Sequence, residues 1–267
     1  MVLNVKFEYS NTVYRPGSSG IRFLYILWRR FTNGTAPPSD WTIIAAMTAK
    51  NKRDIPKQAD RAKQILEQFD RAYPDAQCAL HFSTPLELLI ATILSAQCTD
   101  ERVNIVTQDL FNKYKSPADY AGAKTEILEN DIRSTGFFRN KTRSIQGACR
   151  KILDTFGGKV PDTMDELLEL PGVARKTANV VLGAAFEKAA GVVVDTHVFR
   201  VSRRLDLSKG KTPENIERDL MRILPQNRWI SFSHQTILHG RKICKARKPL
   251  CLQCPVESLC SSSDKTM

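Results

Sequence analysis

The stretch Leu170-Pro-Gly-Val-Ala-Arg-Lys-Thr-Ala-Asn179 decides how the rest of the chain is interpreted. A tight Pro-Gly turn leads into an apolar run, which predicts a short helix, a hairpin turn and a second helix. Consecutive backbone amides at such a turn, with the positive end of the second helix, can hold a phosphate oxygen. An ordinary corner between two helices is the alternative, and the hairpin alone does not decide between the two.

Lys176 lies in the expected first turn of that second helix. The partial positive charge of a helix N-terminus disfavours an ammonium and relatively favours the neutral amine, the nucleophilic form of lysine. The alternative is a lysine that only contacts a phosphate or solvent. Further along the chain, Val194-Asp-Thr-His197 predicts that Asp195 caps the next helix. One carboxylate oxygen suffices for the cap, which leaves the other available to face a site.

Charge and cysteine content narrow the class of protein. The 267 residues include 40 Lys and Arg against 28 Asp and Glu, a net charge of +12. This excess suits a polyanionic partner such as nucleic acid, but it is a weak signal by itself. Seven cysteines without a secretory signal indicate a reducing compartment. No apolar run reaches the ~18 residues of a membrane span, so no membrane association is expected.

Helical signals are dense after Pro56, where apolar residues recur at helical spacing and Thr-Pro and Ser-Pro pairs mark helix starts. The predicted fold class is all-α, with Val192–Val194 as the only strand-like run. The helix opened by Thr84 is apolar nearly all round and is expected at the centre of the core. The expected helices cover residues 56–73, 85–95, 101–114, 124–134, 141–156 and 229–244, with shorter ones opened by Ser116, Thr163, Asp195 and Thr212.

Residues 1–55 are expected to form a disordered extension. Pro16-Gly17 and Pro37-Pro38 interrupt regular structure, and the segment holds six Lys or Arg against two acids through Lys50. It lacks the composition of an organellar transit peptide. A start of translation at Met47 is the plainer hypothesis, which an intact mass matching all 267 residues would exclude.

Four cysteines near the C-terminal end have the spacing C-x6-C-x2-C-x5-C. So short a stretch predicts one metal centre, and the spacing by itself leaves zinc and an iron–sulfur cluster equally open. The loop after the first cysteine has three positive charges and no acid, so we expect it to contact phosphates. The ligands are Cys244, Cys251, Cys254 and Cys260, the loop cations are Lys245, Arg247 and Lys248, and Cys78, Cys98 and Cys149 are expected to be packing thiols.

Several separated motifs together resemble the endonuclease III branch of the helix-hairpin-helix DNA glycosylases. They are Leu170–Asn179, Val194–His197, Ser95–Asp100 and Leu238–Arg241 with the four cysteines, in the family's order, and the resemblance covers about residues 55 to 262. It implies two helical lobes. The helix-hairpin-helix lobe is expected over 82–189, a discontinuous iron–sulfur lobe over 56–81 plus 190–262, and a tail over 263–267.

The resemblance implies a bifunctional DNA glycosylase with AP lyase activity in base excision repair of oxidised pyrimidines. Lys176 matches the lysine that attacks the sugar and forms a Schiff base, which β-elimination then resolves. Asp195 matches the acid that deprotonates the lysine and stabilises positive charge on the sugar. The four cysteines would hold one four-iron four-sulfur cluster. The expected partner is double-stranded DNA with damaged pyrimidines or abasic sites, and the expected protein is a monomer, cytoplasmic and nucleoid-associated if bacterial.

The resemblance also assigns DNA contacts. Gln97 matches a residue that inserts beside the orphan base, and Phe137 matches an apolar wedge. Without the resemblance, Gln97 would be an exposed helix-end glutamine and Phe137 a core aromatic. Ala174 stands where the family often has glycine, and we expect helical angles there, so that alanine costs nothing. The expected hairpin contacts are Gly172, Val173, Ala174 and Arg175.

Three rival functions differ from this assignment in the residues they require. The branch that removes adenine opposite oxidised guanine has another residue at the place of Lys176 and a glutamate aligned with Ile93, and this chain has neither signature. A non-catalytic DNA-binding or redox-sensing protein would be expected to lack Lys176 or Asp195. A sister enzyme that prefers another lesion, such as mismatched thymine, stays open.

Overall fold

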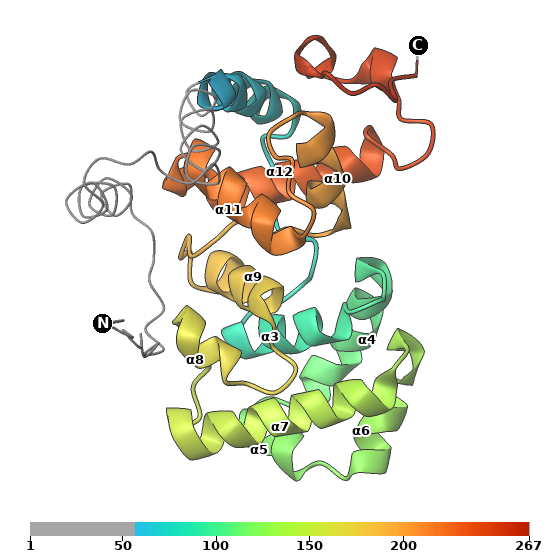
Figure 1. Ribbon diagram of the computed structural model, residues 1–267. Coiled ribbons are helices and arrows are strands. Elements are labelled where there is room, and N and C mark those ends of the chain that lie inside the picture. The colour runs from blue at the N-terminus through green and yellow to red at the C-terminus, as the bar shows by residue number, and fades with distance from the viewer. Residues whose placement is uncertain (1–56, 267) are drawn as a thin grey trace, which may run out of the picture. The chain divides into compact units, whose positions relative to one another are not determined.

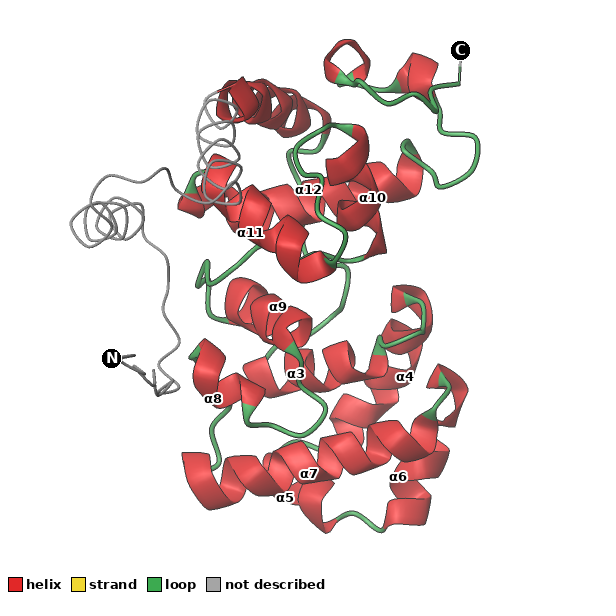
Figure 2. Ribbon diagram, in the orientation of Figure 1, coloured by secondary structure: helices red, strands yellow, loops and turns green. Residues whose placement is uncertain are grey.

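The computed structural model describes residues 57–266, which belong to one compact unit. These residues form helices joined by loops, and none of them is in a strand (Figure 1, Figure 2), which confirms the all-α fold class. No helix of this part of the chain is long and apolar enough to span a bilayer. The expectations for residues 1–55 lie outside the described residues.

The elements follow one another as short and medium-length helices. After a helix over residues 57–72 come α3 (Pro85–Leu94), α4 (Asp100–Lys113), α5 (Pro117–Gly122), α6 (Thr125–Asp131), η1 (Arg133–Thr135), α7 (Phe138–Phe156), α8 (Met164–Leu168), α9 (Arg175–Ala185), α10 (Thr196–Arg204), α11 (Pro213–Ile223), η2 (Gln226–Arg228), α12 (Trp229–Lys242), η3 (Cys251–Gln253) and η4 (Glu257–Leu259).

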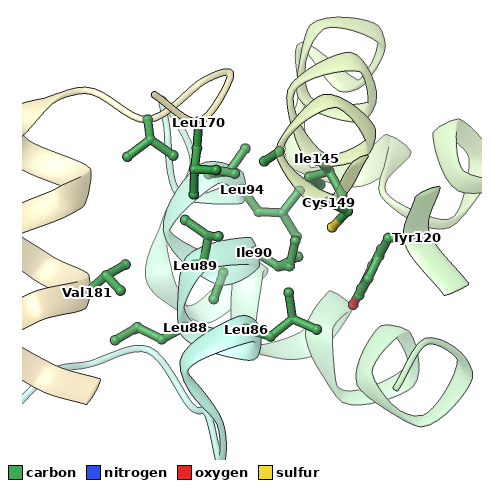
Figure 3. Close-up of a cluster of buried hydrophobic side chains, with 14 of the residues drawn as sticks. Leu86, Leu88, Leu89, Ile90, Leu94, Tyr120, Ile145, Cys149, Leu170 and Val181 are labelled. Atoms are coloured by element: carbon green, nitrogen blue, oxygen red, sulfur yellow. The ribbon is translucent and has the colours of Figure 1, made fainter. Parts of the chain in front are cut away.

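Helix α3 is the centre of the first hydrophobic core, as its sequence predicts. The Thr84 side chain caps it by accepting from the Glu87 amide, and eight of its ten residues are buried. Figure 3 shows Leu89 and Ile90 of this helix among side chains from α7 and α9. Full burial of one such side chain stabilises the fold by about 1.5–3 kcal/mol, so α3 holds its neighbours firmly in place.

A second core is built from segments far apart in the sequence. Ala62, Ile65 and Phe69 of the helix over 57–72 pack with buried side chains of α10, α11 and α12. Helices α10 and α12 contact each other in this core, while α3 and α9 contact each other in the first (Figure 1). The side chains of the first core come from residues 78–190 and those of the second from residues 62–76 and 189–260, while the predicted lobe boundaries stay a prediction.

Two local expectations need correction. The helix expected over 124–134 ends at Asp131 and continues as the short 3-10 turn η1, after which Gly136 turns the chain with a φ of 72°. Val192–Val194 is buried but forms no strand, because the Val193 amide donates to the Ser233 hydroxyl at 3.1 Å rather than to a neighbouring strand. This link carries the chain from the first core to the second.

Candidate functional site

The predicted helix-hairpin-helix is formed by α8, a tight turn and α9. Thr163 caps α8 through the Glu166 amide. Gly172 has a φ of +79°, and a Cβ there would lie 2.5 Å from the Ser144 Cβ of α7. Only glycine therefore satisfies both the backbone angle and the space at this position. The sequence predicted that Gly172 contacts DNA, but it held no sign of this close packing against α7.

Ala174 is the N-cap of α9, with φ −95° and ψ 170°. The expectation of helical angles is wrong in detail, because these angles are extended. Its conclusion holds nevertheless, since an extended backbone accommodates alanine without the strain of a positive φ. The substitution of alanine for the family's frequent glycine therefore leaves the turn unstrained.

The amides at the start of α9 are available to a ligand. No backbone hydrogen bond within residues 57–266 uses the Arg175, Lys176 or Thr177 amide as donor. The Val173 amide, in contrast, donates to the Leu170 carbonyl at 3.1 Å, and the Val173 side chain belongs to the first core. Val173 therefore stabilises the turn itself. Its amide is already used within the chain, so it is not available for the DNA contact that the resemblance implies.

Lys176 and Asp195 line one pocket of about 390 Å³. Lys176 is exposed in the first turn of α9, and Asp195 is half-buried at the N-cap of α10. Asp195 Oδ1 accepts from the amides of His197 and Val198, at 2.8 Å each. This confirms the predicted cap and leaves Oδ2 with no hydrogen-bond partner among the described residues. An amine and a carboxylate that share a pocket can exchange a proton during nucleophilic catalysis.

Asp100, Arg241 and His234 also line this pocket, and no local sequence pattern assigns a function to them. Asp100 Oδ2 accepts from Arg241 Nη2 at 2.5 Å, and both residues line the pocket. His234 lies there too, and burial lowers the pKa of its imidazole. Asp100 lies in the motif Ser95–Asp100, and Arg241 lies in the motif Leu238–Arg241. These motifs were the only indication in the sequence that the two residues belong to the site. Their pairing is visible only once α4 and α12 are placed together.

Arg175 contacts a carboxylate of its own chain. Its Nε donates to Glu217 Oε2 at 2.7 Å, while Asn179 Nδ2 donates to Glu217 Oε1 at 2.8 Å. Glu217 is 6% exposed and its bond to Asn179 is buried, whereas the bond to Arg175 is partly exposed. The pair anchors α9 to α11, and the expected contact of Arg175 with DNA stays a prediction.

Gln97 and Phe137 both lie on exposed loops with unusual backbone angles. Their φ values are 53° and 48°, in the left-handed region that residues other than glycine seldom occupy. Phe137 is 62% exposed, so the alternative interpretation of a core aromatic is wrong. Gln97 is exposed just past the end of α3, which agrees with both interpretations of it. Their roles in opening a duplex stay predictions.

The four C-terminal cysteines surround a single pocket together with Arg204 and His239. The loop that follows Cys244 is fastened by its backbone, because Arg204 Nη1 donates to the Lys245 carbonyl at 2.7 Å and Arg204 Nη2 donates to the Ala246 carbonyl at 3.2 Å. The three cations of this loop are exposed to solvent; they are Lys245, Arg247 and Lys248. The arrangement presents three positive charges beside the cysteines.

Comparison with known proteins agrees with this geometry. Residues 90–226 match the HhH-GPD superfamily base excision DNA repair protein family, and residues 244–260 match the iron-sulfur binding domain of endonuclease III. Endonuclease III of Synechocystis sp. is 55% identical over 211 residues, covering 79% of this chain and 96% of the relative. This chain belongs to the endonuclease III family. The family resemblance inferred from the separated motifs is thereby confirmed.

Two solved structures give the same family context. A trapped endonuclease III–DNA covalent intermediate is 46% identical with a TM-score of 0.73, covering 76% of this chain and 95% of that one. A thermostable thymine-DNA glycosylase is 26% identical with a TM-score of 0.66, covering 78% of this chain and 97% of that one. As a member of the endonuclease III family, the chain is a bifunctional DNA glycosylase and AP lyase of base excision repair.

The chain also has the family's iron–sulfur binding domain, and its cysteines fit an iron–sulfur cluster. Within residues 57–266 no group of three or more His, Cys, Asp or Glu lies so as to hold a metal ion, and the four cysteines line one pocket. Donors lie beside the sulfurs, with Arg204 Nη1 3.4 Å from Cys244 Sγ and the Thr266 amide 3.4 Å from Cys251 Sγ. Such N–H donors suit thiolates that bind an anionic cluster. Burial raises the pKa of the Cys254 thiol to about 11, and the positive charge of a bound metal would favour its thiolate.

Proposed function

We propose that this chain removes oxidised pyrimidines from double-stranded DNA and cuts at abasic sites, with Lys176 as the nucleophile and Asp195 as its partner. The observation that carries the proposal is that both side chains line one pocket, although α9 belongs to the first core and α10 to the second. A covalent route is also supported by the trapped covalent intermediate of the related endonuclease III.

The chemistry needs an amine and a nearby carboxylate. The Lys176 amine adds to C1′ of the damaged nucleotide while the bond to the base breaks, and the base leaves with the electron pair. Loss of the nitrogen's protons and opening of the sugar ring give a Schiff base. Removal of a proton from C2′ then forms a carbon–carbon double bond and expels the 3′ phosphate. Asp195 Oδ2, which the helix cap does not use, accepts the lysine proton and stabilises positive charge on the sugar.

The rest of the described surface supplies the DNA contacts in this proposal. Available amides at the start of α9 hold one phosphate, and the cations of the cysteine loop contact another. Gln97 and Phe137 fill the gap that the displaced nucleotide leaves. The four cysteines would hold a four-iron four-sulfur cluster through their thiolates. We further propose that the enzyme acts as a monomer, in a bacterial cytoplasm near the nucleoid.

Borohydride trapping tests the nucleophile. The protein is incubated with duplex DNA that carries one oxidised pyrimidine, the reductant is added, and a covalent adduct is sought by gel shift. The expected adduct disappears in Lys176→Gln and persists in Lys188→Gln, whose lysine pairs with Asp162 outside the pocket. An adduct that persists in Lys176→Gln would reject Lys176 as the nucleophile.

Asp195→Asn tests the second residue with little change in shape. The asparagine oxygen can still accept from the His197 and Val198 amides, so the cap is retained while the negative charge is lost. Base excision is expected to slow by a factor of about 10²–10⁴, the range for one general base. Unchanged excision would remove Asp195 from the proposal.

A sister preference for mismatched thymine is the second candidate, since a thymine-DNA glycosylase is among the similar structures. A substrate panel with an oxidised pyrimidine, a thymine opposite guanine and an abasic site separates the two. Faster excision of the mismatched thymine than of the oxidised pyrimidine would favour the sister enzyme.

A further inference from the structure

Lys141 is a buried lysine in the first turn of α7 whose ammonium joins two loops. It is 4% exposed, and Nζ donates to the Leu94 carbonyl at 2.8 Å and to the Thr135 carbonyl at 2.7 Å. Leu94 is the last residue of α3, and Thr135 is the last residue of η1. No acidic side chain within residues 57–266 forms a salt bridge with this ammonium, so its partners are backbone groups.

Each of these two carbonyls lies immediately before one of the loops with left-handed angles. Gln97 follows Leu94 by three residues, with a φ of 53°, and Phe137 follows Thr135 by two residues, with a φ of 48°. Such angles cost of order 1–3 kcal/mol in residues other than glycine and persist only where the surroundings impose them. The Lys141 ammonium, which donates a hydrogen bond at the base of each loop, helps to impose these angles.

The charge of Lys141 suits this place for a physical reason. The last carbonyls of a helix have no partner within the helix and carry a partial negative charge, so an ammonium at the end of α3 is favourable. Burial nevertheless lowers the pKa of Lys141, which means that the ammonium is held there against a desolvation penalty. An apolar side chain could fill the same space, but it could not bond two carbonyls from separate elements.

We propose that Lys141 is a positioning residue for opening the duplex: it fixes the mutual placement of the Gln97 and Phe137 loops so that both side chains enter the DNA together. The inference rests on the proposed function, in which those two residues fill the gap left by the displaced nucleotide. Extruding a nucleotide costs a few kcal/mol, and side chains placed in advance reduce what must be ordered at that moment.

The test compares a reaction that needs duplex opening with one that does not. Lys141→Met keeps the length of the side chain and removes its donors. Excision of an oxidised pyrimidine from duplex DNA is expected to slow about tenfold or more in single-turnover measurements, as misplacement of positioning groups does. Cleavage of an abasic site in a single-stranded oligonucleotide is expected to stay within about twofold of wild type, since no stack has to be opened. Fluorescence of 2-aminopurine opposite the lesion should rise less in the variant.

Ile152→Ala provides the matched control for a general loss of stability. Ile152 is fully buried in the same helix α7, about three turns beyond Lys141, and its truncation costs about 2–5 kcal/mol without touching either loop. Its ratio of duplex to single-stranded cleavage is expected to equal that of wild type. Lys141→Arg keeps the positive charge and the donors. Its ratio of duplex to single-stranded cleavage is expected to lie between those of Lys141→Met and wild type.

The outcomes separate the inference from the proposed function. Wild-type protein that excises no oxidised pyrimidine would reject the proposed function. Wild-type excision with an unchanged duplex to single-stranded ratio in Lys141→Met would reject only the positioning role. If Lys141→Met does not fold, the ratio in Lys141→Gln decides, because glutamine is uncharged and one atom shorter than lysine. A value equal to that of wild type, together with a wild-type 2-aminopurine signal, would overturn the proposal, and a reduced ratio would support it.

Discussion

Glu217 Oε2 and Arg175 Nε are 2.7 Å apart, and this ion pair joins the first residue of α9 to α11 in the second core. Lys176 directly follows Arg175, so the pair sets the position of the nucleophile proposed for the reaction. Asn179, one helical turn later, donates to the other oxygen of the same carboxylate. One buried carboxylate therefore holds the first turn and a half of α9 at two points.

Glu217→Gln should weaken this attachment. The glutamine side chain has one oxygen and one NH₂ group in place of the two carboxylate oxygens. The N–H donor of either Arg175 or Asn179 would therefore face the NH₂ group and lose its acceptor. The free energy of unfolding is expected to fall by about 1–3 kcal/mol, the cost of an unsatisfied buried polar group. Urea unfolding and the rate of excision measure the two effects. Glu214→Gln, at an exposed site of the same helix, is the control, and equal behaviour of the two variants would contradict the prediction.

Gly172→Ala should destabilise the hairpin far more than Ala174→Gly. The first substitution places a Cβ at a φ of +79° and 2.5 Å from Ser144, for an expected loss of about 1–3 kcal/mol. The second removes a Cβ from an extended N-cap and should change stability by less than about 1 kcal/mol. Thermal unfolding of the two variants in parallel measures this, and equal losses would show that the turn has no special need for glycine.

Replacement of Lys245, Arg247 and Lys248 by alanine should reduce the salt dependence of DNA binding. The slope of log K against log salt concentration is expected to decrease in magnitude by about 0.9 for each phosphate that the loop no longer neutralises. A triple alanine variant of lysines that pair with carboxylates elsewhere serves as the control; these are Lys113, Lys151 and Lys188. If both triple variants keep the wild-type slope, the cysteine loop does not contact phosphates.

Arg204→Met should loosen the iron–sulfur site. The substitution removes the donor to Cys244 Sγ and the bonds to the Lys245 and Ala246 carbonyls. Loss of such supporting bonds typically lowers metal affinity by a factor of about 10–100. Iron content after incubation with a chelator is the measurement, and Arg203→Met, an exposed neighbour on α10, is the control. Equal iron retention in the two variants would mean that Arg204 does not support the cluster.

Protonation of His234 should couple stability to pH. Burial lowers its pKa from the ordinary value of 6.5, so the unfolded chain binds this proton more readily than the folded one. The contribution to stability is therefore fully present above pH 6.5 and is lost as the pH falls through the lowered value. Urea unfolding at about pH 7.5 and about pH 5.5 should show a smaller loss for His234→Gln than for wild type. Equal losses would place the pH dependence elsewhere.

Much of the architecture could be predicted because it depends on neighbours in the chain. The caps at Thr84, Ser116, Thr163 and Thr212 each use an amide three residues later, and all four are present. The Asp195 cap is equally local, since its oxygen reaches amides two and three residues away. The apolar pattern of α3 placed it in the core, and the spacing of the cysteines with the separated motifs pointed to the family.

The site as a whole depends on contacts between distant residues, which no local pattern contains. Lys141 reaches a carbonyl 47 positions away, and Arg175 reaches a carboxylate 42 positions away. The left-handed angles of Gln97 and Phe137 are unfavourable for these residue types by themselves, so local preference would have assigned other conformations. The sequence by itself determined the helices, their caps and the chemical groups; only the packing of two separate cores decided which groups share a pocket and which loops are held together, because burial and hydrogen bonds across the fold outweigh local backbone preference.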